Sequence, residues 1–169
     1  IIEAIQHARQ DRPLQEQILN SEVAQLLLRR ARKHRYYFPA MRRLLAVARL
    51  LPARDAIVFE SGLGKQYGDS PRFIYEELVR RGDPRPKIWV YNRAVPVWDP
   101  GLVVVERLSP GYFWHLGRAS HWVNNQNFPH YIRRRRDGVY VQTWHGTPLK
   151  RMLHDLDEIV GRDDGNVDR

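Results

Sequence analysis

The stretch after Pro52 alternates short apolar runs with amphipathic segments, and this alternation constrains the fold more than any other feature. Apolar runs of strand length, separated by segments of helical periodicity, are typical of parallel strands joined by helices. The expected strands are 56–60, 87–91, 102–106, 121–124 and 138–144, and the expected helices are 71–81, 109–119 and one that begins at 147. We therefore predict an α/β fold in which a parallel sheet is flanked by helices.

Two of the expected helices carry residues that suit helix ends. Ser109 is a favoured N-cap, and Pro110 after it suits the first helical position. Gly82 is well placed to close the earlier helix, since glycine adopts the left-handed conformation found after many helix ends. We expect Asp69 or Ser70 to cap the start of that helix.

The sequence before Pro52 is helical and basic. Helices are expected at 21–35, with Ser21 as N-cap, and at 39–51. Between Arg29 and Arg54 there are nine Lys or Arg residues and no Asp or Glu. We divide the chain into a basic amphipathic helical arm, 1–52, and an α/β domain, 53–169, that is expected to be truncated.

Three interpretations of this arm remain open. Its charges form a solvated face on helices that pack against the rest of the protein, or they attract the arm to a surface of anionic lipid. Nucleic acid is the third and least favoured partner, because the sequence matches no signature of a nucleic-acid-binding module.

The composition narrows the class of protein further. A formal net charge of +9 predicts attraction to polyanions, which include nucleic acid, anionic membranes and phosphate-rich polymers. The chain has no cysteine, and its histidines lack the close pairing of zinc sites, so no metal site is expected. No run approaches the roughly 20 apolar residues that span a bilayer. We expect a soluble or peripheral protein and, from the missing Met and the polar end at 161–169, a fragment.

Four consecutive arginines, 133–136, form the only low-complexity feature. Pro129 precedes them and Asp137-Gly138 follows as a turn signal, so they are expected in a connection between strands. A solvated loop is one interpretation. A loop that contacts phosphate is the other, because guanidinium groups match phosphate oxygens in pairs.

The first candidate site is the loop after the expected strand 56–60. Three glycines between residues 61 and 70 permit unusual backbone angles, and Gly64 and Lys65 lie at its centre. The helix start near Asp69 and Ser70 offers backbone amides to an anion, with Lys65 as a point charge nearby. The spacing fits neither a P-loop nor a dinucleotide fingerprint, and a structural turn explains the loop about as well.

The second candidate site follows the expected strand that ends at Trp144. Thr147 as N-cap and Pro148 at the first helical position place the next helix, so His145 falls in the short turn between strand and helix. An imidazole there can accept a hydroxyl proton while helix amides hold phosphoryl oxygens. A single histidine is more often structural, so position alone does not settle its role.

Three separated segments resemble the CDP-glycerol:poly(glycerophosphate) glycerophosphotransferases, which polymerise or prime wall teichoic acid. The resemblance covers about 55–152, and the order and rough spacing of its segments agree. The segments that carry it are Glu60-Ser61 with Gly64-Lys65-Gln66-Tyr67, Asp69-Ser70-Pro71 and Ile74-Tyr75-Glu76; Trp122-Val123-Asn124-Asn125; and Tyr140-Val141-Gln142 with Thr143-Trp144-His145-Gly146-Thr147-Pro148-Leu149-Lys150-Arg151.

The resemblance implies a GT-B architecture of two Rossmann-like domains, of which this chain would hold the N-terminal, acceptor-side one. It implies that His145 deprotonates the terminal glycerol hydroxyl of the acceptor, which then attacks the β-phosphorus of CDP-glycerol and releases CMP. No cofactor is implied, since CDP-glycerol is the donor substrate. The residues expected to bind substrate or phosphate are Gly64, Lys65, Asp69, Ser70, Trp144, Gly146, Thr147 and Lys150.

The implied partners are a lipid-linked anionic polymer acceptor, the inner face of the cell membrane as a peripheral surface, and a missing C-terminal nucleotide-binding domain of the same protein. A cytoplasmic location and an inactive isolated fragment follow from these. A related ribitol-phosphate or capsule-polymer transferase, and a basic module without catalysis, remain alternatives.

The sequence departs from the family pattern in the first loop. Gly62-Leu63 stands where an aromatic or bulky residue is common, and Gly68 stands where a polar residue is common. These departures affect the details of the loop. His115, His121, His130 and His154 match no functional family position and are expected to be structural or surface residues.

Overall fold

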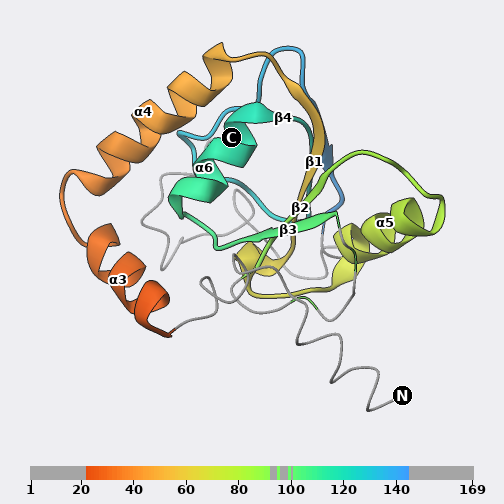
Figure 1. The fold of residues 1–169 in the computed structure, drawn as a ribbon, viewed down its shortest axis with the longest axis horizontal. Coiled ribbons are helices and arrows are strands. Elements are labelled where there is room, and N and C mark those ends of the chain that lie inside the picture. The colour runs from red at the N-terminus through yellow and green to blue at the C-terminus, as the bar shows by residue number, and fades with distance from the viewer. Residues whose placement is uncertain (1–21, 92–94, 96–98, 100, 145–169) are drawn as a thin grey trace, which may run out of the picture.

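Five parallel strands form the sheet seen in the computed structural model, which describes residues 22–91, 95, 99 and 101–144. Within these residues the spatial order is β3-β2-β1-β4-β5 (Figure 1). All four neighbouring pairs are parallel. The strands are β1 (Arg54–Glu60), β2 (Lys87–Val90), β3 (Leu102–Val105), β4 (Ala119–Asn124) and β5 (Val139–Gln142).

Helices cover both faces of this sheet. Figure 1 shows helices on either side of the sheet, among them the helix that links β3 to β4. The helices are α3 (Glu22–Arg32), α4 (Tyr37–Leu50), α5 (Asp69–Arg80) and α6 (Pro110–Arg118), with a 3-10 turn, η1 (Gly62–Gly64), after β1. Helix α5 occupies the first face, and α4 and α6 the second.

Alternation along the strands builds a core on each face. In β1, Ala56 and Val58 point toward α4 and α6, whereas Ile57 and Phe59 point toward α5. Both sets are buried, as expected for a central strand of a parallel sheet. On the α5 side, the Phe59 ring stacks on Trp89 at 5.6 Å between centroids.

The strand registers place the last residue of every strand in one row. Glu60 pairs with Val90 on one side and with Asn124 on the other, and the row continues to Val105 and Gln142. From β1 the chain moves outward through β2 to β3, and it then returns to place β4 on the other side of β1. The carboxyl ends of β1 and β4 therefore flank the point where the strand order reverses, which is where open α/β sheets bind ligands.

The fold class predicted from the sequence, a Rossmann-like parallel sheet flanked by helices, is confirmed. The five strands and the two helices that connect them lie where the patterns place them, to within a few residues. Ser109 is the N-cap of α6, where its Oγ accepts a hydrogen bond from the Tyr112 amide at 3.2 Å. Gly82 closes α5 with a φ of +68°, and the bonds of its amide to Val79 and of Asp83 to Leu78 complete the expected cap.

The predicted N-cap of α5 is wrong. The residue at the cap position is Gly68, and neither Asp69 nor Ser70 makes a capping hydrogen bond. Asp69 is the first residue of the helix, with a φ of +55°, and its carboxylate instead accepts a hydrogen bond from Asn125. The Asp69 side chain therefore bonds to Asn125, which follows β4, and not to the backbone amides at the start of its own helix.

The two helices of the predicted arm contact the rest of the structure. Helix α4 packs on α6 so closely that a Cβ on Gly117 would lie 2.5 Å from the Cβ of Ala48. Leu45 and Ala48 are buried there. Helix α3 is joined to the loop after β3 by an ion pair between Arg32 and Glu106 at 3.0 Å. These contacts favour helices that pack on the domain, while the division at residue 52 stays a prediction.

Two predicted features fall beyond the described residues. Ser21 as an N-cap and the helix that begins at 147 both lie outside them. Within the described residues, no helix has the length and apolar content needed to cross a membrane. The same residues hold no group of three or more potential metal ligands.

Candidate functional site

The loop after β1 is held in place by one side chain from the end of β4. Asn125 is buried, and its Oδ1 accepts a hydrogen bond from the Gly62 amide at 3.1 Å. Its Nδ2 donates to Ser61 Oγ at 3.2 Å and to Asp69 Oδ2 at 2.8 Å. One side-chain amide at the end of β4 therefore fixes both the start of the loop after β1 and the first residue of α5.

The loop itself has an unusual backbone. Gly62, Leu63 and Gly64 have φ values of +54°, +58° and +73°. Such angles are accessible to glycine but cost a residue with a Cβ roughly 1 to 2 kcal/mol. Gly64 is also buried, and a Cβ there would lie 3.0 Å from the Cβ of Arg107. The glycine predicted as a site residue is required by backbone shape and by a close approach to the loop after β3.

The predicted phosphate ligands of this loop lie at the surface. Lys65 and Ser70 are exposed, and within the described residues the Lys65 ammonium has no hydrogen bond or ion pair. The amides of Asp69 and Ser70 open α5, where no preceding turn of the helix can accept their hydrogen bonds. A cation and two helix-start amides thus lie next to the reversal point, an arrangement that suits an anion.

A buried ion pair lies beneath this loop. Glu60 Oε1 accepts a hydrogen bond from Arg107 Nε at 3.0 Å, and Glu60 is fully buried. Burial raises the pKa of Glu60, and the Arg107 guanidinium only partly offsets this effect. The pKa of Tyr112, which is buried beside the pair, is likewise raised by burial and by the Glu60 charge.

Three buried polar atoms around this pair lack a well-formed hydrogen bond within the described residues. They are Glu60 Oε2, the Tyr112 hydroxyl and Asn124 Nδ2. Glu60 and Asn124 are register partners, so their side chains project from the same face of the sheet. Unsatisfied polar groups are rare in protein interiors and concentrate at functional places. Glu60 ends β1 and Asn124 ends β4, so buried polar atoms without a partner lie on both sides of the reversal point.

The second candidate segment begins at the end of β5, where the chain is a strand as predicted. The Thr143 amide donates to the Asn124 carbonyl at 2.9 Å, which extends the ladder by one residue. Trp144 follows with a φ of +60°, which is an outlier for a bulky residue. It is 41% exposed, and its amide donates to Gln142 Oε1 at 3.2 Å.

Backbone strain marks this edge of the sheet. The described non-glycine residues with positive φ are all in loops or helix starts beyond the carboxyl ends of strands: Leu63, Asp69, Leu108 and Trp144. Strain of this kind persists where surrounding contacts impose it and clusters at functional sites.

The remaining predicted site residues cannot be placed. His145, Gly146, Thr147 and Lys150 lie outside the described residues. The structure brings Gly64, Lys65, Asp69 and Ser70 to one loop and puts Trp144 beyond a different strand. Asn124 and Asn125 join the two segments, since the first bonds to Thr143 through its carbonyl and the second bonds to the loop after β1.

The sequence analysis assigned no site role to three residues of this edge: Glu60, Arg107 and Asn125. Glu60 and Asn125 carried a usable signal, because a polar residue at the end of a buried strand, or directly after it, marks the carboxyl edge. Arg107 gave none, because its partner is 47 residues away in the chain.

The arginine run lies in the connection between β4 and β5, as predicted. Arg135 is the structural member, since its NH1 donates to the carbonyls of Arg49 and Leu51 at the end of α4, at 2.7 and 2.9 Å. Arg133, Arg134 and Arg136 lie on the solvent side of the same connection.

The family model and the similar curated proteins point to the same family. Residues 43–167 match the family described as CDP-Glycerol:Poly(glycerophosphate) glycerophosphotransferase. The teichoic acid poly(glycerol phosphate) polymerase of Bacillus subtilis (strain 168) is 38% identical over 118 residues, which are 68% of this chain and 16% of that protein. The protein of the same description from Staphylococcus epidermidis is 42% identical over 101 residues, which are 59% of this chain and 14% of that protein.

Solved structures agree in fold. The wall teichoic acid polymerase TagF matches with a TM-score of 0.62 at 32% identity, over 83% of this chain and 34% of that chain. A variant of TagF soaked with CDPG matches with a TM-score of 0.62 at 30% identity, over 85% of this chain and 37% of that one. The chain thus spans about a third of these structures and less than a fifth of the two curated relatives above. With a family match over residues 43–167, it belongs to the CDP-glycerol:poly(glycerophosphate) glycerophosphotransferase family.

Proposed function

We propose that the protein containing this chain transfers glycerol phosphate from CDP-glycerol to the terminal hydroxyl of a lipid-linked poly(glycerol phosphate) chain. Family membership supports the reaction class. The observation that carries the proposal is the shared edge. The strand before His145 ends beside Asn124, and Asn125 holds the loop that presents Lys65.

In the proposed reaction His145 is the general base. It takes the proton of the acceptor's terminal hydroxyl, and the oxygen then forms a bond to the β-phosphorus of CDP-glycerol. The bond between that phosphorus and the oxygen bridging to the α-phosphate breaks, and CMP leaves with the bonding electron pair. General base catalysis contributes roughly 10²- to 10⁴-fold to such a step. His145 follows the strained Trp144 directly in the sequence.

The loop after β1 supplies charge and amides in this proposal. The Lys65 ammonium and the amides of Asp69 and Ser70 contact phosphoryl oxygens, and Gly64 lets the loop take the necessary shape. Gly146, Thr147 and Lys150 follow the base in sequence and extend the phosphate contacts from the other segment. Positioning and charge stabilisation supply the part of catalysis that the base does not.

Two further proposals concern the rest of the protein. Because the chain spans 16% of its Bacillus subtilis relative, we place the CDP-glycerol pocket in a C-terminal nucleotide-binding domain of a GT-B pair. The fragment alone would then release no CMP. No metal or other cofactor takes part in the steps proposed for these residues.

A peripheral position at the inner membrane face suits the helices before the sheet. On α3 the apolar Val23, Leu26 and Leu27 are between 62% and 66% exposed, and Arg29 and Arg30 follow them. Apolar side chains insert into a lipid interface, and each nearby basic residue adds about 1 kcal/mol at an anionic surface. The anionic lipid and the anionic acceptor both match the basic charge of the chain.

The experiment replaces His145 with Ala in the full-length protein and follows CMP release with a lipid-linked acceptor. We expect transfer to fall at least about 100-fold while binding of a polyanion is unchanged. His34→Ala, which changes an exposed histidine between α3 and α4, is the matched control and should keep full activity. Normal polymerisation by the His145 variant would refute the mechanism.

A further inference from the structure

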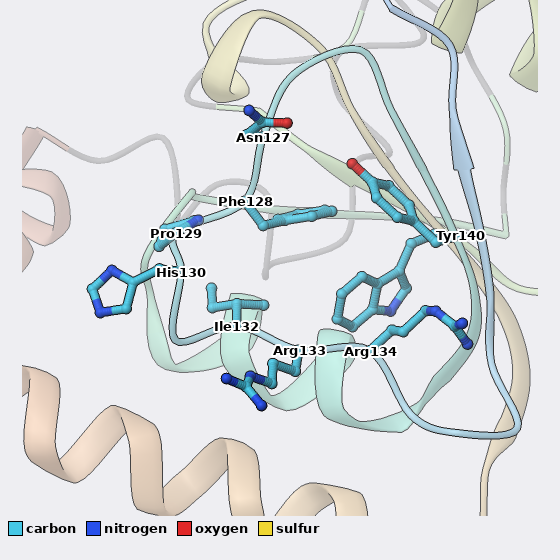
Figure 2. A pocket seen from close by; sticks show the side chains of 9 residues that line it. Asn127, Phe128, Pro129, His130, Ile132, Arg133, Arg134 and Tyr140 are labelled. Carbon is cyan, nitrogen blue, oxygen red and sulfur yellow. The ribbon is translucent and has the colours of Figure 1, made fainter. Parts of the chain in front are cut away.

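The connection from β4 to β5 covers its part of the sheet with a loop instead of a helix. Parallel strands are usually joined by a crossover helix that covers one face, but residues 125–138 form no helix. The loop arches over the face that α4 and α6 also cover, and a hollow of about 450 Å³ lies beneath it (Figure 2). A volume of this size is within the range of small-molecule sites.

Three aromatic side chains form the inner wall of the hollow. Trp122 comes from β4, Tyr140 from β5 and Phe128 from the loop, and their ring centroids are 5.0 to 6.3 Å apart. The rings meet at 54° to 70°, so they form an angular cup. Such an apolar cup offers contact to the carbon atoms of a compact aliphatic unit.

Cationic groups line the open side of the hollow. Arg133 and Arg134 belong to its lining, and Figure 2 shows both on the side opposite Asn127. Within the described residues Arg133 has no hydrogen bond or ion pair, while Arg134 donates to the Gly138 carbonyl at 2.7 Å. The nearby carboxylate of Asp137 is paired with Arg135. The rim therefore carries positive charge that no described carboxylate balances.

The hollow is adjacent to the candidate site. Tyr140 lies two residues before the end of β5, so at about 3.3 Å per residue its ring begins roughly 7 Å below the carboxyl edge. The Tyr140 hydroxyl and Gln142 Nε2 both donate to the Gln126 carbonyl, which ties the loop to the end of the strand. One extended ligand can reach both places.

We propose that this hollow binds an internal glycerol phosphate unit of the acceptor chain, behind the terminal unit that reacts. The inference rests on the proposed function for the identity of the ligand. The three-carbon backbone packs in the aromatic cup, and the phosphodiester pairs with Arg133. A membrane is a poorer occupant, because the exposed residues of the loop are all polar and include Asn127, His130, Arg133 and Arg134.

The test uses two variants of the full-length protein, Arg133→Gln and Phe128→Leu. The first removes the unpaired charge, and the second removes a ring face but keeps an apolar side chain. Arg80→Gln is the control, since it removes the same charge from an exposed position on α5, on the opposite face of the sheet. Calorimetry measures the Kd for synthetic tetra(glycerol phosphate), and CMP release gives kcat and the acceptor KM.

We expect Arg133→Gln to raise both Kd and acceptor KM about fivefold, with kcat unchanged, because one charge-assisted contact is lost. Phe128→Leu should raise both about threefold, because a ring face is lost while apolar contact remains, and Arg80→Gln should change neither. Repeating the titration in His145→Ala separates the two proposals, since binding there needs no chemistry. Arg133-dependent tetramer binding by a wild-type protein that shows no transfer would refute the proposed function alone.

Three outcomes overturn the inference. The first is an acceptor KM that neither variant changes in an enzyme that transfers normally. The second is displacement of the tetramer's Arg133-dependent binding by CDP, which would make the hollow a nucleotide site. The third is loss of binding to vesicles of phosphatidylglycerol in Arg133→Gln with tetramer binding intact, which would assign the loop to the membrane.

Discussion

The ends of β1 and β5 lie in one row at one edge of the sheet, yet they are built in opposite ways. The residues that end β1 are buried, and Asn125 makes two hydrogen bonds to the following loop and a third to Asp69 at the start of α5. Strand β5 is at the border of the described sheet, and three of its four residues are exposed. The end of β1 is held by a neighbouring strand on each side, whereas the end of β5 has one described neighbour, β4.

This difference matches the two tasks in the proposed reaction. A phosphate contact needs donors that are fixed before the ligand arrives, since preorganised groups need no rearrangement during the reaction. A catalytic base needs access to the acceptor hydroxyl, which an exposed strand end provides. The comparison makes specific predictions, because a change at the β1 end should affect stability more than an equivalent change at the β5 end.

The largest effect is expected from Asn125→Ala. Removing this amide leaves the Asp69 carboxylate and the Gly62 amide without their partner, at a cost of about 2 kcal/mol in the free energy of unfolding. The matched change Gln142→Ala removes bonds to the Gln126 carbonyl and the Trp144 amide, but Gln142 is exposed and water can replace them, so it should cost less than about 1 kcal/mol. Urea unfolding of the full-length variants measures both. Equal costs would remove the distinction between the two strand ends.

A smaller effect is expected from Gly64→Ala. The alanine must adopt a φ of +73° with its Cβ 3.0 Å from Arg107, so the unfolding free energy should fall by about 1 to 2 kcal/mol. Gly68→Ala is the control in the same loop, because Gly68 has extended backbone angles and a Cβ added there would meet no atom within 4 Å. Thermal unfolding compares them. A control as unstable as Gly64→Ala would show that the loop tolerates no side chain anywhere.

The smallest effect concerns pH and Glu60. Burial raises the pKa of this carboxyl above its ordinary value of 4.5, so the folded state binds the proton more tightly than the unfolded chain does. The wild type should therefore gain stability relative to Glu60→Gln as the pH falls through the raised pKa, and the gain should level off below about 4.5.

Melting temperatures of both proteins between about pH 7 and pH 4 check this sign. The gain is expected to be small because the Arg107 guanidinium opposes the effect of burial. A wild type that loses stability relative to the variant on acidification would mean that the ion pair outweighs burial.

Local sequence signals predicted the elements of the fold well. Apolar runs located the strands, and Ser109 and Gly82 marked helix ends, because these signals act within a few residues of chain. The handedness of the connections between parallel strands is general to such folds and needs little sequence information. The alternation also predicted that a last strand, β5, follows the arginine run.

The site was predictable only in part. Gly64 and Lys65 were identified from their loop, whereas the role of Asp69 as a helix cap was wrong because its partner, Asn125, follows a different strand. The pairing of Glu60 with Arg107 depends on the register of distant segments, which no local pattern contains. The role of His145 stays a prediction.

The junction between α3 and α4 has a mechanical consequence. Arg32 bonds to Glu106 and to the Arg107 carbonyl, and the Tyr37 hydroxyl donates to the Leu108 carbonyl at 2.7 Å. These contacts hold the C-terminal end of α3 and the N-terminal end of α4 against the loop after β3. The same loop carries Arg107, the partner of Glu60. The junction of the two helices is therefore held at a set distance from the carboxyl edge of the sheet, by the same loop that carries Arg107.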